Sequence, residues 1–130
     1  MQIRNLEVSE LEAVRRFLCE QGWAHRVGGP EEFAVLISNS QRTAVAIREN
    51  GEVVGFARGI TDGRTNGYLS MVAVAPEHQR KGIGRALVQH VMGDDPGITW
   101  VLRAGRPGAM EFFAKLGFIV STLAMERTRT

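Results

Sequence analysis

The sequence predicts an α+β fold: one domain over residues 1–130, with a mixed central sheet of about six or seven strands and helices on both faces. Three observations support this. Two helical patterns precede any long strand, an antiparallel strand pair follows, and strands then alternate with helices. A chain of 130 residues that is 44% apolar and 23% charged is typical of a globular protein with one hydrophobic core.

The first third of the chain predicts a short strand and two helices. We expect the strand over residues 3–6. Ser9 and Glu12 have the spacing of a capping box, which predicts the start of a helix, and Gly22 stands where a left-handed residue would end it. Pro30 fits the first turn of a second helix that extends to about residue 38.

The middle of the chain predicts strands. Residues 43–48 and 53–57 are rich in β-branched and alternating apolar residues, and the Asn50-Gly51 pair between them is a strong hairpin signal. Residues 68–74 predict a further strand, which ends before a proline.

The last third returns to alternating elements. The pattern predicts a helix over 82–93, a strand over 98–103 and a helix over 107–117. Residues 118–120 and 123–125 supply the final strands, which complete the expected sheet.

Composition excludes several classes of function. The 16 basic and 14 acidic residues give a net charge of +2, and no run of basic residues indicates nucleic-acid binding. No apolar stretch approaches the length of a membrane span, so no membrane partner is expected. The single cysteine, Cys19, cannot form an intramolecular disulfide, which favours a reducing, cytoplasmic location.

The most informative stretch is 79–87, which follows a predicted strand and opens a helix. Gly82 and Gly84 let the backbone approach a ligand closely, and a helix N-terminus offers free amides to a phosphate. Leu87 stands where a dinucleotide-binding fingerprint needs a small residue, and the pattern of a P-loop is absent. A plain strand-to-helix turn with solvated basic residues remains the alternative.

Two motifs together resemble a known family. Residues 72–87 are similar to the acetyl-CoA signature of the GNAT superfamily of acyltransferases, in which Gln79, Gly82 and Gly84 fill the pattern Gln/Arg-x-x-Gly-x-Gly/Ala. Residues 109–118, Ala-Met-Glu-Phe-Phe-Ala-Lys-Leu-Gly-Phe, resemble the late helix of the same family. The family's order of elements also matches essentially the whole chain.

The resemblance implies direct transfer of an acetyl group from acetyl-CoA to a primary amine of a small molecule or a protein, in a ternary complex without a metal. It places the pantetheine arm along residues 72–74 and the pyrophosphate on the following loop, and it gives the backbone amide of Val72 an oxyanion-stabilising role. The residues expected to bind acetyl-CoA are Val72, Ala73, Val74, Gln79, Arg80, Lys81, Gly82, Ile83, Gly84 and Arg85.

The chain departs from the family at three positions. Phe113 replaces the tyrosine that protonates the leaving thiolate in many relatives, Arg106 replaces a cofactor-binding asparagine, and Val101 stands where N-terminal acetyltransferases carry a glutamate. These departures keep a noncatalytic acyl-CoA-binding module open as an alternative.

The base that deprotonates the acceptor is not named by any motif. We select His25 as the candidate, because it lies between the first two helices, where this family often shapes its acceptor pocket. Asp62 and Glu77 are weaker candidates that fit turns. A homodimer is compatible with the resemblance, although no sequence feature indicates one.

Overall fold

The computed structural model describes all residues, 1–130, and contains one five-stranded sheet in the order β1-β2-β3-β4-β5. The strands are β1 (Gln2–Arg4), β2 (Arg42–Ile47), β3 (Val53–Thr61), β4 (Asn66–Val74) and β5 (Thr99–Val101). The first four pair antiparallel with their neighbours, whereas β5 runs parallel to β4, so the predicted mixed sheet is confirmed.

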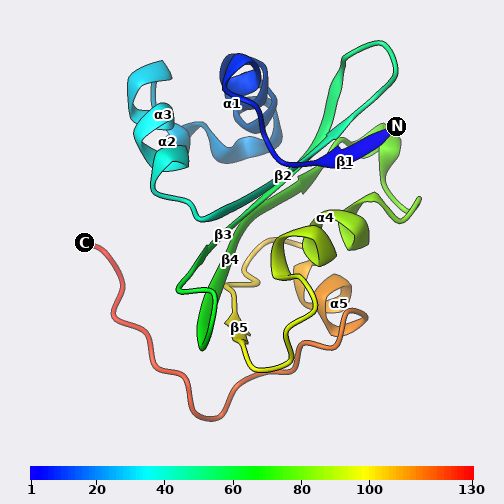
Figure 1. The fold of residues 1–130 in the computed structure, drawn as a ribbon. Coiled ribbons are helices and arrows are strands. Elements are labelled where there is room, and N and C mark those ends of the chain that lie inside the picture. The colour runs from blue at the N-terminus through cyan, green and yellow to red at the C-terminus, as the bar shows by residue number, and fades with distance from the viewer.

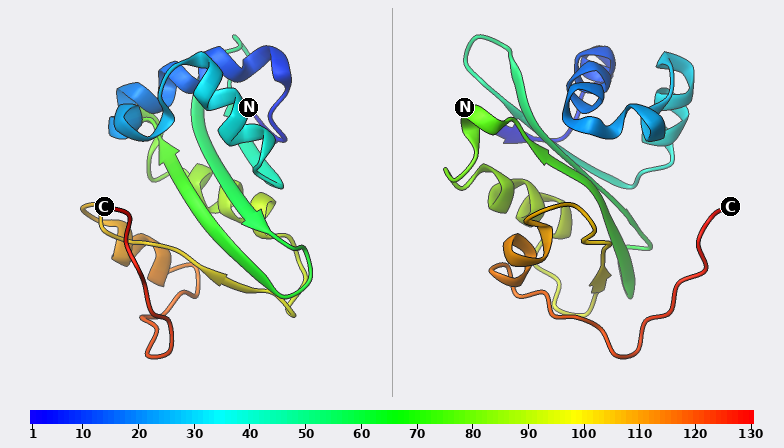
Figure 2. Two further views of the ribbon diagram at one scale, coloured as in Figure 1. Left: turned by 90° about the vertical axis from the view of Figure 1, so that its left-hand side faces the viewer. Right: turned by 180° about the vertical axis from the view of Figure 1, so that it is seen from behind.

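Helices cover both faces of the sheet (Figures 1 and 2), as the sequence predicts. The helices are α1 (Leu11–Leu18), α2 (Ala24–Val27) and α3 (Pro30–Ser38) on one face, and α4 (Ile83–Met92) and α5 (Ala109–Ala114) on the other. None of them combines the length and the apolar character that a membrane-spanning helix requires.

The start of α1 differs from the prediction. A 3₁₀ turn, η1 (Val8–Glu10), precedes the helix, and the Glu7 amide donates to the Glu10 side chain over 2.9 Å. The expected Ser9–Glu12 capping box is therefore wrong, because Glu12 is engaged with Arg15 instead, at 2.6 Å.

Two further short turns link the elements. At the other end of α1, Gly22 has the expected left-handed φ of +92°, inside the π-helical turn η2 (Cys19–Trp23) that leads into α2. A 3₁₀ turn, η3 (Pro76–His78), connects β4 to the segment before α4.

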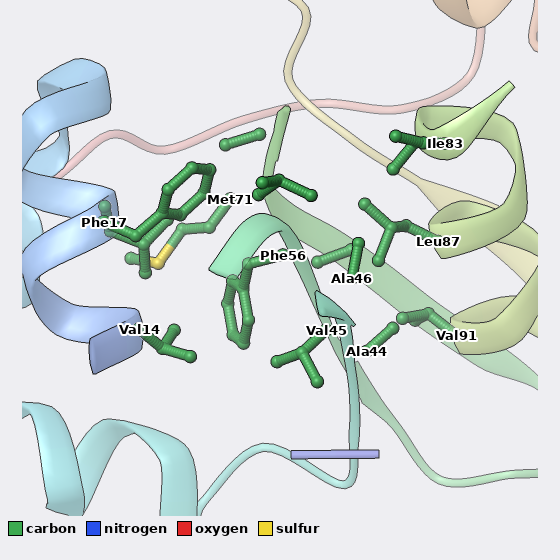
Figure 3. Packing of buried hydrophobic residues seen from close by; sticks show 14 of the residues in the cluster. Val14, Phe17, Ala44, Val45, Ala46, Phe56, Met71, Ile83, Leu87 and Val91 are labelled. Carbon is green, nitrogen blue, oxygen red and sulfur yellow. The ribbon is translucent and has the colours of Figure 1, made fainter. Parts of the chain in front are cut away.

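The hydrophobic core lies on both sides of the sheet (Figure 3). On the α1 side, Phe56 and Val45 face Val14 and Phe17, whereas Ala44 and Ala46 face the side chains of α4. Small residues let α4 lie close to the sheet. A Cβ atom at Gly55 in β3 would come within 2.8 Å of Cδ1 of Leu87, so the Leu87 side chain would have to shift.

The sheet has five strands rather than six or seven, because residues 118–130 form no strand. These residues run away from the sheet in an extended tail (Figures 1 and 2). Ile119 is 90% exposed and Met125 is 98% exposed. Residues of high β-propensity form a strand when their side chains pack on the pleated surface of a sheet, and no strand lies beside the tail. The strands predicted over 118–120 and 123–125 are therefore wrong.

Candidate active site

One edge of β4 is unpaired over most of its length. Only Asn66, Gly67 and Tyr68 pair with β5, and the strand continues without a neighbour on that side from Leu69 to Val74. The left view of Figure 2 shows the two strands together at one end and diverging toward the other. This divergence opens a gap in the sheet that exposes main-chain hydrogen-bonding groups.

A β-bulge lies within this unpaired stretch. Opposite Ala57 of β3, β4 places two residues, Met71 and Val72, and Met71 adopts a φ of +54°. The Ala75 amide donates to the Val54 carbonyl of β3 over 2.8 Å. Because alternate amides along a strand point to opposite edges, the amides of Val72 and Val74 point away from β3, into the gap.

The loop before α4 begins where the open edge ends. The Gln79 side chain donates to the Val74 carbonyl over 3.0 Å and ties the loop to the strand. Gly82 has a φ of +86° and Arg80 a φ of +64°, so the backbone makes a sharp turn into the helix. The amides from Arg80 to Arg85 donate to no acceptor within the chain. These amides and the helix dipole form a cradle suited to an anion.

The two glycines of the loop have different physical roles. No atom lies within 4 Å of a Cβ built at Gly82, so its requirement is the left-handed backbone and the open space in front of it. A Cβ at Gly84 would instead lie 2.9 Å from Cζ of Phe112 on α5. The sequence interpretation of Gly84 as a site of ligand approach misses this packing role.

The basic residues of the loop also differ. Arg80 and Lys81 are exposed beside the cradle, whereas Arg85 donates to the Lys115 carbonyl at the end of α5, over 3.3 Å. Ile83 is buried and packs beside Leu87, so its side chain belongs to the core and only its amide faces the cradle (Figure 3).

The candidate proton-transfer residues lie in different surroundings. His25 is exposed on α2 and makes no side-chain hydrogen bond, and α2 packs against α3 and η2. Asp62 caps the turn between β3 and β4, and hydrogen bonds from Thr65, Arg64 and Asn66 hold the pKa of its carboxyl far below the usual value. Such a group is a poor base. Phe113 is 8% exposed in the core.

Sequence reasoning missed a long-range contact of Arg106. The Arg106 guanidinium lies 4.4 Å from the ring centroid of Trp23 and donates to the Gln21 carbonyl over 2.7 Å. It thereby links the segment after β5 to the π-helical turn at the end of α1. The Trp23 indole nitrogen is buried without a hydrogen-bond partner. No signal in the sequence pairs these two residues, which are distant along the chain.

A comparison with protein families shows which family the chain belongs to. The sequence profile of the acetyltransferase (GNAT) family matches residues 5–118. The chain belongs to the GNAT acetyltransferase family.

Relatives of known sequence agree with this. An uncharacterized N-acetyltransferase, ycf52 of Pyropia yezoensis, is 27% identical in an alignment of 122 positions that covers 89% of this chain and 67% of that protein. Further curated relatives match over 41 to 84 residues, so that the alignments span only 23% to 55% of their length.

Solved GNAT structures have the same fold. A putative acetyltransferase of the family from Xanthomonas campestris superposes with a TM-score of 0.77 at 25% identity and covers 99% of this chain and 94% of its own. The structure of AAC(6')-Iy in complex with a bisubstrate analog of coenzyme A has a TM-score of 0.73 at 18% identity, covering 99% and 98%.

The residues of this GNAT chain fit acetyl-CoA, the family's acyl donor. The open edge of β4 offers unpaired main-chain groups to an amide-containing arm, and the free amides before α4 face an anion at the end of that edge. The cradle and the edge are adjacent and continuous, because Gln79 joins them.

Proposed function

We propose that this GNAT protein moves an acetyl group from acetyl-CoA to a primary amine of a small molecule or a protein, by direct transfer in a ternary complex. The observation that carries the proposal is the unpaired edge of β4, which leads into the free amides between Arg80 and Arg85. β4 is the only interior strand of the sheet that combines an unpaired edge with a following helix N-terminus.

Each part of this edge has a distinct task. The amides before α4 hold the pyrophosphate, while the side chains of Arg80 and Lys81 neutralise its charge. The edge from Val72 to Val74 pairs with the pantetheine arm as an added strand would. The Val72 amide donates to the acyl oxygen as negative charge develops there, an interaction worth about 3 kcal/mol in other enzymes.

Proton transfers accompany the reaction at both ends. The attacking amine must lose a proton before its nitrogen forms the new bond to the acyl carbon, and His25 remains our candidate base. When the carbon–sulfur bond breaks, the electron pair leaves with the thiolate. Phe113 has no proton to give. A thiol with a pKa of about 8.5 has a thiolate that is a tolerable leaving group, and water can protonate it.

A noncatalytic acyl-CoA-binding module is the second candidate. It is favoured by the three departures from the family pattern, since Phe113 is buried in the core and Arg106 is held by Trp23. Release of free CoA thiol over a panel of amines separates the two functions. Binding of acetyl-CoA without release of CoA thiol would favour the noncatalytic module. The cytoplasmic location and the homodimer stay predictions from the sequence.

The donor site is tested by matched glycine substitutions. Gly82→Ala places a methyl group in the open space where the pyrophosphate is proposed to lie, and Gly51→Ala does the same in the β2–β3 hairpin. Both glycines have a φ near +87°, and both have open space around them, so the two variants should lose similar stability. We expect only Gly82→Ala to weaken acetyl-CoA binding, by tenfold or more, in a calorimetric titration.

Two further ligands complete that titration. Free CoA should bind like acetyl-CoA, whereas an adenine nucleotide without the pantetheine arm should bind more weakly, because it cannot pair with β4. Equal affinity of Gly82→Ala and wild type for acetyl-CoA would show that the cradle is not the phosphate site.

A further inference from the structure

Arg58 is a buried cation without an anionic partner. It lies on β3, is only 8% exposed and forms no ion pair. Its Nε donates to the Ser40 hydroxyl over 3.1 Å, and its two terminal nitrogens donate to no acceptor. Other partly buried arginines have partners within the chain. Arg4 is paired with Glu10, and Arg42 donates to two carbonyls at the end of α4.

A buried guanidinium ordinarily has a carboxylate or several carbonyl partners, because removing its charge from water costs several kcal/mol. The nearest polar neighbours in register are hydroxyl groups, Thr43 on β2 and Ser70 on β4. The Thr43 hydroxyl already accepts from the Leu6 amide. Burial lowers the pKa of Arg58, and Tyr68 opposes that shift. The terminal nitrogens are not among the fully buried atoms without a partner, so they reach the molecular surface and can bind a group from outside the chain.

Its position connects this cation with the proposed reaction. Gly55 and Gly59 of β3 face α4, so Arg58 points to the opposite face, beneath α1–α3. It pairs in register with Ser70, the residue immediately before the bulge at Met71. Strand partners lie about 5 Å apart, so the Arg58 backbone lies one strand away from the open edge of β4.

On the face that carries Arg58, the residues of β4 before the bulge are less deeply buried than on the α4 face. On the α4 side, Leu87 and Val91 fill the space over the glycines of β3. On the other side, Tyr68 and Ser70 remain half-buried along β4. An acceptor that approaches the bulge from this side passes Arg58.

We propose that the terminal nitrogens of Arg58 bind an anionic group of the acceptor, a carboxylate or a phosphate. The acceptor is then a compact molecule in which a primary amine and an oxyanion lie a few bonds apart. Two parallel N–H donors match the two oxygens of such a group. This inference rests on the proposed acetyl transfer, because it names the acceptor class of the same site.

The test uses pairs of reaction products in which one member carries the anion and the other is neutral, so it does not depend on turnover. The probes are N-acetylglycine against N-acetylglycinamide, and N-acetyl-2-aminoethylphosphate against N-acetylethanolamine, titrated by calorimetry into protein saturated with CoA. We expect at least one anionic probe to bind tenfold or more tightly than its neutral partner, and the better pair identifies carboxylate or phosphate.

Two variants locate the effect. Arg58→Met should remove the preference for the anion while leaving acetyl-CoA affinity within twofold and the Tm unchanged or raised, because it removes an unpaired buried charge. Arg42→Met is the matched control for an arginine with a structural role. It should lower the Tm and keep the anion preference, since the Arg42 contacts to α4 do not involve the site.

The outcomes separate this inference from the proposed function. If neither anionic probe is preferred, or if Arg58→Met weakens both members of a pair equally, the anion site at Arg58 is overturned. If the preference exists and depends on Arg58 while amines bearing the same anion never release CoA thiol, the anion site stands and acetyl transfer fails.

Discussion

Asp62 shows how one residue can be fixed by its local hydrogen bonds. Its Oδ1 accepts amide protons from Arg64 and Thr65, both at 2.8 Å, and from Asn66 at 3.2 Å. Its Oδ2 accepts from the Thr65 hydroxyl. These bonds close the turn between β3 and β4 and favour the ionised carboxyl, which lowers its pKa.

Asp62→Asn is expected to reduce stability in a pH-dependent way. A carboxyl whose pKa is lower in the folded state stabilises the fold above its unfolded pKa of about 3.9, and this stabilisation is lost as the pH falls toward the folded value. The Tm of the variant should lie below that of wild type at pH 7, and the difference should shrink below about pH 4.

Asp94→Asn is the control for that comparison, because the Asp94 side chain makes no hydrogen bond or ion pair. Its Tm should follow wild type throughout thermal melts from pH 2.5 to pH 8. A constant difference between Asp62→Asn and wild type across that range would contradict the assignment.

Single residues also show which roles can be predicted from the sequence and which cannot. Gln79 and Gly82 could be placed in the loop because the residue types and their spacing carry the chemistry. The sequence names Arg58 only together with Arg103 and Arg106 as an arginine that could bind an anionic acceptor. It could not be distinguished from them, because its burial follows from the neighbouring strands and from Ser40, which is distant along the chain.

Among the elements, α4 and α5 are joined through Gly84. The helices meet where Phe112 lies against the glycine, so the space for a side chain is occupied by an aromatic ring. Phe112 in turn packs edge-to-face on Phe113, with centroids 4.9 Å apart. The position of α5 therefore depends on the absence of a Cβ atom at Gly84.

Gly84→Ala is expected to destabilise the fold by about 1–3 kcal/mol, through the strain of inserting a methyl group into a packed site. Urea denaturation measures the loss. The double variant Gly84→Ala/Phe112→Leu should recover part of it, because the smaller side chain frees space. An additive double variant would mean that Phe112 is not the group that the methyl meets.

Most elements could be predicted where local signals agree with tertiary packing. The Asn50-Gly51 turn and the left-handed Gly93 after α4 fixed boundaries to within a residue or two. β3 extends to Thr61, beyond the predicted end at residue 57, because its pairing with β4 continues there. That extension depends on a partner strand, which local propensity does not specify.

At the scale of the whole molecule, the tail contributes little to the buried interior. Phe118 packs on Phe113 with centroids 5.6 Å apart, but the residues after it have exposed side chains. The one ion pair of the tail joins Glu126 to Arg103 at the surface. Exposed ion pairs of this kind contribute about 0–1 kcal/mol.

A chain shortened after Phe118 should keep the unfolding free energy of the full chain to within about 0.5 kcal/mol. Phe118→Ala in the full chain should instead lose about 1 kcal/mol or more, because an aromatic contact with the core disappears. Chemical denaturation compares the two. A large loss on shortening would mean that the apolar residues of the tail pack on the sheet in solution.

The unpaired edge of β4 has a consequence for handling the protein. Strand edges in the middle of a sheet are templates on which other chains assemble, and proteins usually conceal them. From Leu69 to Val74 this edge is neither paired nor interrupted by a proline. A bound coenzyme would occupy it. Aggregation during storage and concentration should therefore be slower with coenzyme A present, and the purified protein is best kept in its liganded form.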